Sequence, residues 1–200
     1  MKPAARSGAT PTDARAAILD AAVALLLSRR GTDITTDEVA RKVGCAKGLV
    51  HYHFKGKDQL LAAAAERLWQ QRADAWTGAL GLESPNAAIR QAWETMVAES
   101  STGIAASCAT LGMRSEPLVV RSVSTARAAF SRGIAAALER MLAQLRLEPS
   151  VPTRELGALL VATIEGIGLQ LGSGVPADEM EQAWSAFWAG LLSLTRPRRA

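Results

Sequence analysis

The sequence predicts an all-α protein of about nine helices, with a helix-turn-helix unit close to its N-terminus. Apolar residues recur at helical spacing through most of the 200 residues, whereas no segment has the sustained alternation of a β-strand. Glycine and proline clusters divide these segments into lengths typical of helices. The composition, 48% hydrophobic and 21% charged, is that of a globular chain long enough to bury a sizeable core.

The first two helices are marked by their end signals. The first is expected over residues 15–30, because its apolar periodicity stops at Gly31. Thr35 and Glu38 then fit a capping box, in which each side chain bonds the backbone N–H of the other residue. Gly44 would end the short helix that this box opens, since glycine readily adopts the left-handed conformation of a helix C-terminus.

A third helix begins near Ala46, directly after this turn. If Val50 and Phe54 point inward, one turn apart, the opposite face lies open to solvent. Such a face suits the major groove of DNA, because it combines donors, an apolar group and a small residue that permits close approach. The residues on it or at its edges are Lys47, Gly48, Leu49, His51, Tyr52 and Lys55.

The remaining helices are delimited mainly by proline and glycine. The segment that follows the third helix is long enough to link an N-terminal head to a larger body. The expected ranges are 57–80, 85–100, a helix between Gly103 and Pro117, 119–147, 153–171 and a last helix that ends at 194.

Positive charge is concentrated at the N-terminal end. Residues 1–57 hold ten Lys and Arg against five Asp and Glu, and they include every Lys of the chain. Residues 58–195 hold ten basic against fourteen acidic residues. A charge run alone is usually a solvated surface, but here it coincides with the paired short helices. The distribution therefore predicts binding to DNA phosphates.

Other interpretations of the His-rich segment are disfavoured. The alternation over residues 51–54 is too short for a strand, and His51 and His53 point to different sides of a helix. The chain has only these two His and two distant Cys, so no metal site and no cofactor are predicted. With both His on the proposed DNA helix, no catalytic triad or Cys-His pair remains, and an enzyme is not expected.

The sequence favours a cytoplasmic protein without a membrane partner. The longest apolar stretch, residues 156–171, contains Glu165, and the basic N-terminus lacks the apolar core of a signal peptide. Cys45 and Cys108 are too few for a disulfide framework, which fits a reducing compartment.

Residues from about 15 to 61 resemble the N-terminal domain of the TetR family of transcriptional repressors. The resemblance covers a quarter of the chain. Spacing, turn and aromatic cluster agree together in AAILDAAVALLLSRRG, the double threonine 35–36, the VA pair 39–40, the GC turn 44–45, AKGLVHYHF and KDQLL at 57–61. The family implies an all-helical dimeric regulator whose first three helices bind DNA, and whose C-terminal helices dimerise and enclose a ligand pocket.

This resemblance implies a division into domains and a set of DNA contacts. Residues 1–58 would be the helix-turn-helix DNA-binding domain, with 1–12 as a flexible arm. Residues 59–195 would bind effector and dimerise, and 196–200 would be a basic tail. The expected DNA-contacting residues are Thr35, Thr36, Ala46, Lys47, Gly48, Leu49, His51, Tyr52, Lys55 and Lys57.

The recognition helix also departs from the family pattern. Ala46 stands where relatives usually carry Ser, so a helix cap worth about 1 kcal/mol is missing. Leu49 stands where Thr is usual and His51 where Tyr is common. Because Leu neither donates nor accepts a hydrogen bond, apolar and backbone contacts with DNA gain importance.

The last two helices are expected to form the dimer surface. The helix over 153–171 is apolar nearly all round, and the next helix carries an aromatic stripe. The alternative is an ordinary monomer core, since a stripe does not reveal which chain it faces. The candidate interface residues are Gly157, Leu160, Ile164, Gly168, Trp184, Phe187, Trp188 and Leu191.

A ligand pocket is expected in the middle of the chain. Its candidate residues are Trp69, Trp76, Trp93, Met96, Cys108, Leu111, Met113 and Phe130, with Arg114 and Glu165 as polar anchors. The alternative for each apolar residue is plain core packing. Glu165, in an apolar helix, needs a partner and would either bond across the dimer or anchor the ligand.

These features lead to three functional hypotheses. The favoured one is a repressor that binds a palindromic double-stranded DNA operator as a homodimer and is released by a small apolar or amphipathic molecule. The second is a DNA-binding regulator of the same fold controlled by a protein partner or by its abundance. The third, a helical enzyme, lacks candidate catalytic residues.

Overall fold

The computed structural model describes residues 11–198, in which it places nine α-helices and one two-stranded sheet. This result confirms the all-α class predicted from the sequence. The helices are α1 (Pro11–Ser28), α2 (Thr36–Val43), α3 (Lys47–Phe54), α4 (Lys57–Leu80), α5 (Pro85–Thr102), α6 (Ile104–Gly112), α7 (Pro117–Gln144), α8 (Thr153–Gly172) and α9 (Ala177–Ser193). The strands are β1 (Leu147–Pro149) and β2 (Thr195–Pro197).

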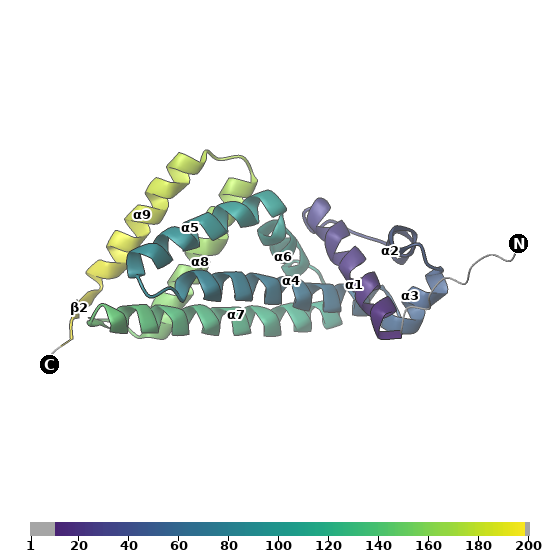
Figure 1. Ribbon diagram of the computed structural model, residues 1–200, viewed down its shortest axis with the longest axis horizontal. Coiled ribbons are helices and arrows are strands. Elements are labelled where there is room, and N and C mark those ends of the chain that lie inside the picture. The colour runs from purple at the N-terminus through teal and green to yellow at the C-terminus, as the bar shows by residue number, and fades with distance from the viewer. Residues whose placement is uncertain (1–10, 199–200) are drawn as a thin grey trace, which may run out of the picture.

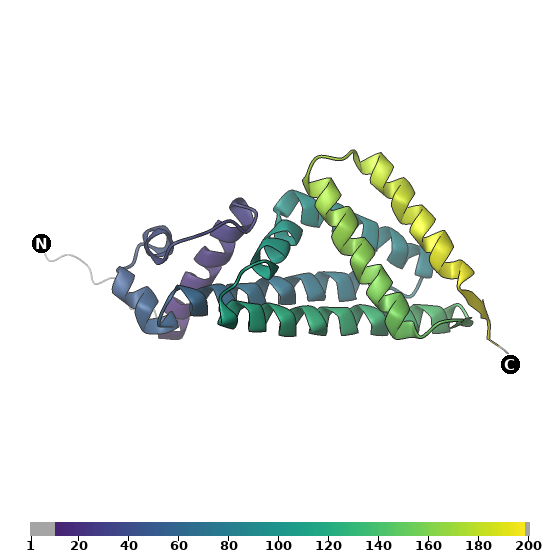
Figure 2. The same cartoon turned by 180° about the vertical axis from the view of Figure 1, so that it is seen from behind.

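The first three helices gather at one end of the molecule (Figure 1). We call α1–α3 the head. The remaining helices form the body, and α4 runs from the head along its length beside α7. Figure 2 shows α8 and α9 next to each other on one face of the body. One core joins these parts, because buried side chains continue from α1 through α4 to α8 and α9.

The helix caps predicted for the head are present in the structure. The hydroxyl of Thr35 accepts from the backbone N–H of Glu38 at 3.2 Å, and the Glu38 carboxylate accepts from the N–H of Thr35 at 2.8 Å. Gly44 ends α2 in the left-handed conformation, with φ of +76°. Ala46 provides no side-chain cap for α3, as expected. Val50 and Phe54 are buried, so the inward face of α3 was assigned correctly.

Both ends of the described chain require corrections. Helix α1 begins at Pro11, so residues 11 and 12 are helical and do not belong to an arm, while the rest of the expected arm lies outside the described residues. Residues 195–197 pair antiparallel with 147–149, so part of the expected tail is a strand. Three-residue strands are too short to show alternation, and their partners lie far apart in sequence. Residues 199 and 200 lie outside the described part.

Helix α8 corrects a second expectation. Among the described residues, one helix, α8, has the length and the apolar composition needed to cross a membrane. The sequence-based expectation excluded such a segment because of Glu165. Packing accounts for part of this composition, because α8 contacts α5, α6, α7 and α9 within the body. Only 39% of its apolar window is buried, so the helix also has an exposed apolar face.

Candidate nucleic-acid interface and ligand cavity

Helix α3 presents an exposed polar surface at the end of the head. Tyr52 is 75% exposed, which places an aromatic ring and a hydroxyl at the tip of this surface. Leu49 is half-buried and packs against the core, so it is less available to a thymine methyl than expected. The other exposed residues are Lys47, Gly48, His51 and Lys55. This surface remains the best candidate for a major-groove contact.

Lys47 on this surface and Lys57 at the start of α4 already have partners within the head. Lys47 Nζ bonds Asp37 at 2.9 Å, and Lys57 Nζ bonds Asp33 at 2.5 Å. A cation is unfavourable for the dipole at a helix N-terminus, and Asp33 provides one partner for Lys57 there. Lys55, at the left-handed end of α3 with φ of +51°, forms no ion pair with any described residue. Lys55 is therefore the more available of these cations.

The capping box also carries the head's most perturbed acid. Arg29 Nη2 bonds the Glu38 carboxylate at 2.7 Å, and the hydroxyl of Thr35 reaches the same carboxylate at 2.9 Å. Together with the Thr35 backbone N–H, these donors lower the pKa of Glu38 to about 2, and the bond from Arg29 is the largest cause. The Thr35 hydroxyl thus has an internal role besides any contact with DNA.

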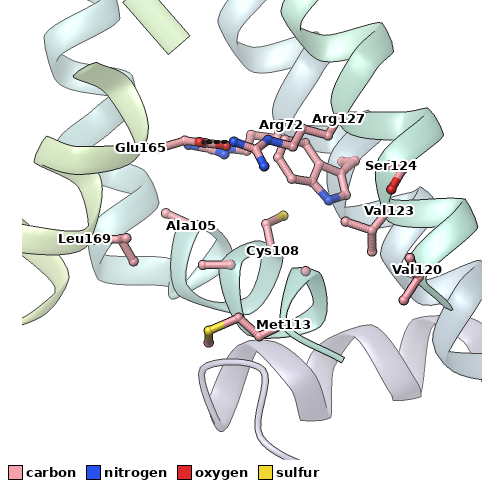
Figure 3. Close-up of a pocket in the computed structure, with 13 residues that line it drawn as sticks. Arg72, Ala105, Cys108, Met113, Val120, Val123, Ser124, Arg127, Glu165 and Leu169 are labelled. Atoms are coloured by element: carbon pink, nitrogen blue, oxygen red, sulfur yellow. Dashed lines mark hydrogen bonds and ion pairs between the residues drawn. The ribbon is translucent and has the colours of Figure 1, made fainter. Parts of the chain in front are cut away.

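A cavity of about 300 Å³ lies in the body, between α4, α6, α7 and α8. Figure 3 shows Arg72, Arg127 and Glu165 along one side of it, with Cys108 and Met113 on the other. Trp69, Ala105, Ala109, Gly112, Val120, Val123, Ser124 and Leu169 complete the lining. The cavity is therefore apolar over most of its wall and polar at one side, as small-molecule sites commonly are.

The structure places some of the predicted pocket residues at the cavity and the others elsewhere. Trp69, Cys108, Met113 and Glu165 line the cavity. The others lie elsewhere, because an apolar stripe indicates that residues are buried but not that they border a pocket. Trp76, Met96 and Leu111 are core residues, Trp93 is half-buried against the core, Phe130 borders a separate hollow of about 240 Å³, and Arg114 lies at the head.

Sequence analysis missed a buried ion pair beside the cavity. Arg72 Nε bonds both carboxylate oxygens of Glu99, at 3.1 and 3.0 Å, and Trp76 Nε1 donates to Glu99 at 2.8 Å. Arg72 is 2% exposed and Glu99 is 5% exposed. Burial is the largest effect on Glu99 and raises the pKa of its carboxyl, which Arg72 opposes. A usable signal existed, because Arg72 lies at helical spacing between Trp69 and Trp76.

Two residues that line the cavity each have a buried donor without a hydrogen-bond partner among the described residues. These are Nη2 of Arg72 and Nε1 of Trp69. A buried donor without an acceptor typically costs about 1–3 kcal/mol, so the pair stands out in a folded protein. The guanidinium carbon of Arg72 also lies 5.4 Å from the centre of the Trp69 ring and 5.1 Å from that of Phe130. The faces of both rings are thus already turned toward a cation.

The remaining polar groups of the cavity balance each other. Arg127 Nη2 bonds Glu165 at 2.9 Å, which gives Glu165 the partner it needs in an apolar helix. This bond joins α7 to α8 within one chain, so Glu165 does not depend on a dimer contact for its partner. Burial raises the pKa of the Cys108 thiol to about 12, so the floor of the cavity is uncharged at neutral pH.

The cavity is connected to the head through α6. Ser107 Oγ donates to the carbonyl of Leu26 at 3.1 Å, and Thr110 Oγ1 donates to the carbonyl of Arg30 at 3.2 Å. Gly31 makes this approach possible, because a Cβ there would lie 2.8 Å from Cα of Ser107. Directly after α6, Arg114 bonds Asp33 of the head at 3.1 Å. A movement of α6 would therefore change these contacts with the head.

The proposed interface residues of α8 and α9 require a correction. Phe187 is half-buried, and the rest are buried inside the single chain: Gly157, Leu160, Ile164, Gly168, Trp184, Trp188 and Leu191. A Cβ at Gly157 would lie 2.6 Å from Cβ of Ala135, so this glycine allows α7 and α8 to pack closely. The stripe fills the chain's own core, and the exposed face of these two helices is the opposite one.

That opposite face is apolar and made of small residues. On α8 it exposes Leu159 and Leu169, at 47% and 46%, with Ala162 and Gly166 between them. On α9 it exposes Ala186 and Gly190. Small side chains allow two helix backbones to approach closely.

Comparisons with known proteins agree with the description of a helix-turn-helix head on a helical body. The model of the family "Bacterial regulatory proteins, tetR family" matches residues 18–64, which cover most of the head and the start of α4. The chain is 32% identical over 95 residues, 47% of its length, to two proteins of Pseudomonas putida, the HTH-type transcriptional regulator SrpR and the uncharacterized HTH-type transcriptional regulator TtgW. The match spans 41% of SrpR and 65% of TtgW.

Solved structures extend the similarity of fold to the body. A TetR-family regulator structure from Mesorhizobium loti aligns with a TM-score of 0.76 at 15% identity, over 94% of this chain and 99% of that one. A transcriptional regulator from Saccharomonospora viridis in complex with choline aligns with a TM-score of 0.66 at 21% identity, over 88% and 95%. These relatives are regulators and not enzymes. The head of this chain thus matches the TetR family of transcriptional regulators, and the whole chain shares the fold of TetR-family structures.

Proposed function

We propose that this protein is a repressor that binds a palindromic operator as a homodimer and releases it when a small apolar or amphipathic molecule occupies the cavity. The observation that carries this proposal is the continuity of α6. Met113 at its end borders the cavity, and the next residue, Arg114, bonds Asp33 of the head. A ligand that shifts α6 would alter the position of the head, and with it the affinity for DNA.

The DNA side of the proposal rests on the α3 surface and its need for a second copy. One short helix reads too few base pairs for a specific site, so two heads must bind half-sites about one DNA turn apart. Lys55 and the N-terminal backbone N–H groups of α3, which Ala46 leaves uncapped, would bind phosphates. The protein would act in the cytoplasm, where it meets the chromosome.

The second copy would pack on the exposed face of α8 and α9. In this arrangement Ala162 and Gly166 of one chain approach the same face of its partner, and a four-helix bundle results. Sedimentation should then give a mass of about twice 21.1 kDa. Ala162→Arg, a change on the exposed face, should yield a folded monomer with weak operator binding.

Leu191→Arg is the matched comparison, because Leu191 is 1% exposed. A charge there should unfold the chain and not merely separate the copies. A wild-type protein that stays monomeric at micromolar concentration would contradict the dimer and the palindromic operator together. An Ala162→Arg variant that remains a dimer would place the interface elsewhere.

The ligand side is tested with operator fragments selected from genomic DNA. Small amphipathic molecules should raise the melting temperature of the free protein and release the DNA, since both effects follow from preferential binding to one state. Stabilisation without release would leave a binding cavity that does not control the head. If neither effect occurs across a broad panel, control by a protein partner or by abundance becomes the better explanation.

A further inference from the structure

The chemistry of the cavity wall restricts which molecule can fill it. Its unpartnered buried groups, Arg72 Nη2 and Trp69 Nε1, are both donors, and their side chains are 2% and 3% exposed. Neither a guanidinium nor an indole N–H accepts a hydrogen bond. A ligand group placed beside them must therefore be a hydrogen-bond acceptor. The cavity's volume of about 300 Å³ lies at the low end for ligand sites, so the molecule is small.

The charges around the cavity are already paired. Arg72 bonds the Glu99 carboxylate, and Arg127 bonds that of Glu165. A carboxylate ligand would gain Arg72 only against the repulsion of Glu99 and Glu165. A cationic ligand would find both acids occupied, and Arg72 already lies over the rings of Trp69 and Phe130. The balance of charges favours an uncharged ligand.

We infer that the cavity binds a small uncharged molecule with an apolar body and one strong acceptor, such as a carbonyl oxygen. The acceptor receives hydrogen bonds from Arg72 Nη2 and Trp69 Nε1, and the apolar body lies against Cys108 and Met113 on the opposite side (Figure 3). This inference rests on the proposed function, because it assigns the chemical class of the effector for the same cavity.

Matched aromatic probes test this assignment by calorimetry on the full chain. Butyrophenone has a neutral carbonyl, butylbenzene lacks the acceptor, benzoate adds negative charge and phenyltrimethylammonium adds positive charge. Butyrophenone should bind about three- to tenfold more tightly than butylbenzene, which is the contribution of an ordinary hydrogen bond. Benzoate and phenyltrimethylammonium should bind more weakly than the ketone.

Two indole substitutions provide the control. Trp69→Phe removes the N–H but keeps an aromatic ring, so the preference for butyrophenone over butylbenzene should fall about threefold or more. Trp188 on α9 also has a buried Nε1 without a partner, but it does not line the cavity. Trp188→Phe should therefore leave the preference unchanged.

The outcomes separate this inference from the proposed function. Equal binding of ketone and hydrocarbon, tighter binding of either ion, binding of none of the probes, or an unchanged preference in Trp69→Phe would each overturn the inference. Binding of butyrophenone without release of operator would support the inference and contradict the proposed switch. Release of operator by a charged molecule would do the reverse.

Discussion

Arg114, directly after α6, donates to the carboxylate of Asp33 in the loop between α1 and α2, at 3.1 Å between Nη1 and Oδ1. The other oxygen of Asp33 accepts from Lys57 at the start of α4, and Glu116 holds Arg114 from the other side. Asp33 of the head therefore contacts both the start of α4 and the segment that follows α6.

Asp33→Ala should uncouple the cavity from the head. Exposed ion pairs typically contribute about 0–1 kcal/mol, so the fold should persist and ligand affinity should change little. The ratio of operator Kd values with and without ligand should move toward one, as measured by fluorescence anisotropy. Asp20→Ala is the control, because Asp20 pairs with Arg67 at 3.4 Å between α1 and α4 without reaching α6. An unchanged ratio in Asp33→Ala would exclude this route.

Lys57→Ala should weaken binding to operator and to random DNA alike. An ammonium has three donors, and Asp33 is the one acceptor found for that of Lys57 among the described residues, so a phosphate contact is still open to it. Loss of one phosphate contact should reduce the slope of log K against log salt by about one unit. Lys57→Arg should largely retain the slope. A folded Lys57→Ala protein with the wild-type slope would leave Lys57 with a purely internal role.

Gly48→Ala should stabilise the protein and impair operator binding. Nothing lies within 4 Å of a Cβ built at Gly48, and alanine favours a helix by up to about 1 kcal/mol over glycine. The added methyl should obstruct the approach of α3 to DNA. Gly78→Ala on α4 is matched, because its added Cβ also meets nothing within 4 Å, yet it lies far from α3. Wild-type operator affinity in Gly48→Ala would place this residue outside the interface.

Acid should destabilise the head through Glu38. Its pKa is about 2 in the folded chain, against an ordinary 4.5, so the folded state releases the proton more readily. The resulting stabilisation is complete above about pH 4.5 and is lost as the pH falls toward about 2. Glu116 titrates in the same window, because Arg114 lowers its pKa to about 2 as well.

Melting temperatures between pH 6 and pH 2 would show the contribution of Glu38 (roughly the range over which a depressed carboxyl acts). Glu38→Gln should lower the melting temperature at neutral pH and flatten its dependence on pH. Glu181→Gln on α9, where Glu181 forms no ion pair with a described residue, should follow the wild-type curve. Equal steepness in Glu38→Gln and wild type would mean that other acids account for the loss.

The features that could be predicted from the sequence are those that depend on neighbours along the chain. The capping box of Thr35 and Glu38 and the left-handed Gly44 are local, because the atoms involved lie within one helical turn of each other. The inward positions of Val50 and Phe54 follow from helical periodicity alone. These local rules were sufficient to identify the head and its exposed α3 surface.

Which partner each buried stripe faces could not be predicted in this way, because it depends on how the helices pack together. Leu160 and Trp188 fill the chain's own core, although their pattern is equally compatible with a dimer interface. Arg72 and Glu99 are separated by 27 positions, so their pairing follows from the packing of α4 on α5 and not from local spacing. The cavity was likewise decided at this level. A pocket forms where helices fail to fill a gap between them, and helical periodicity indicates which residues are buried but not where such a gap lies.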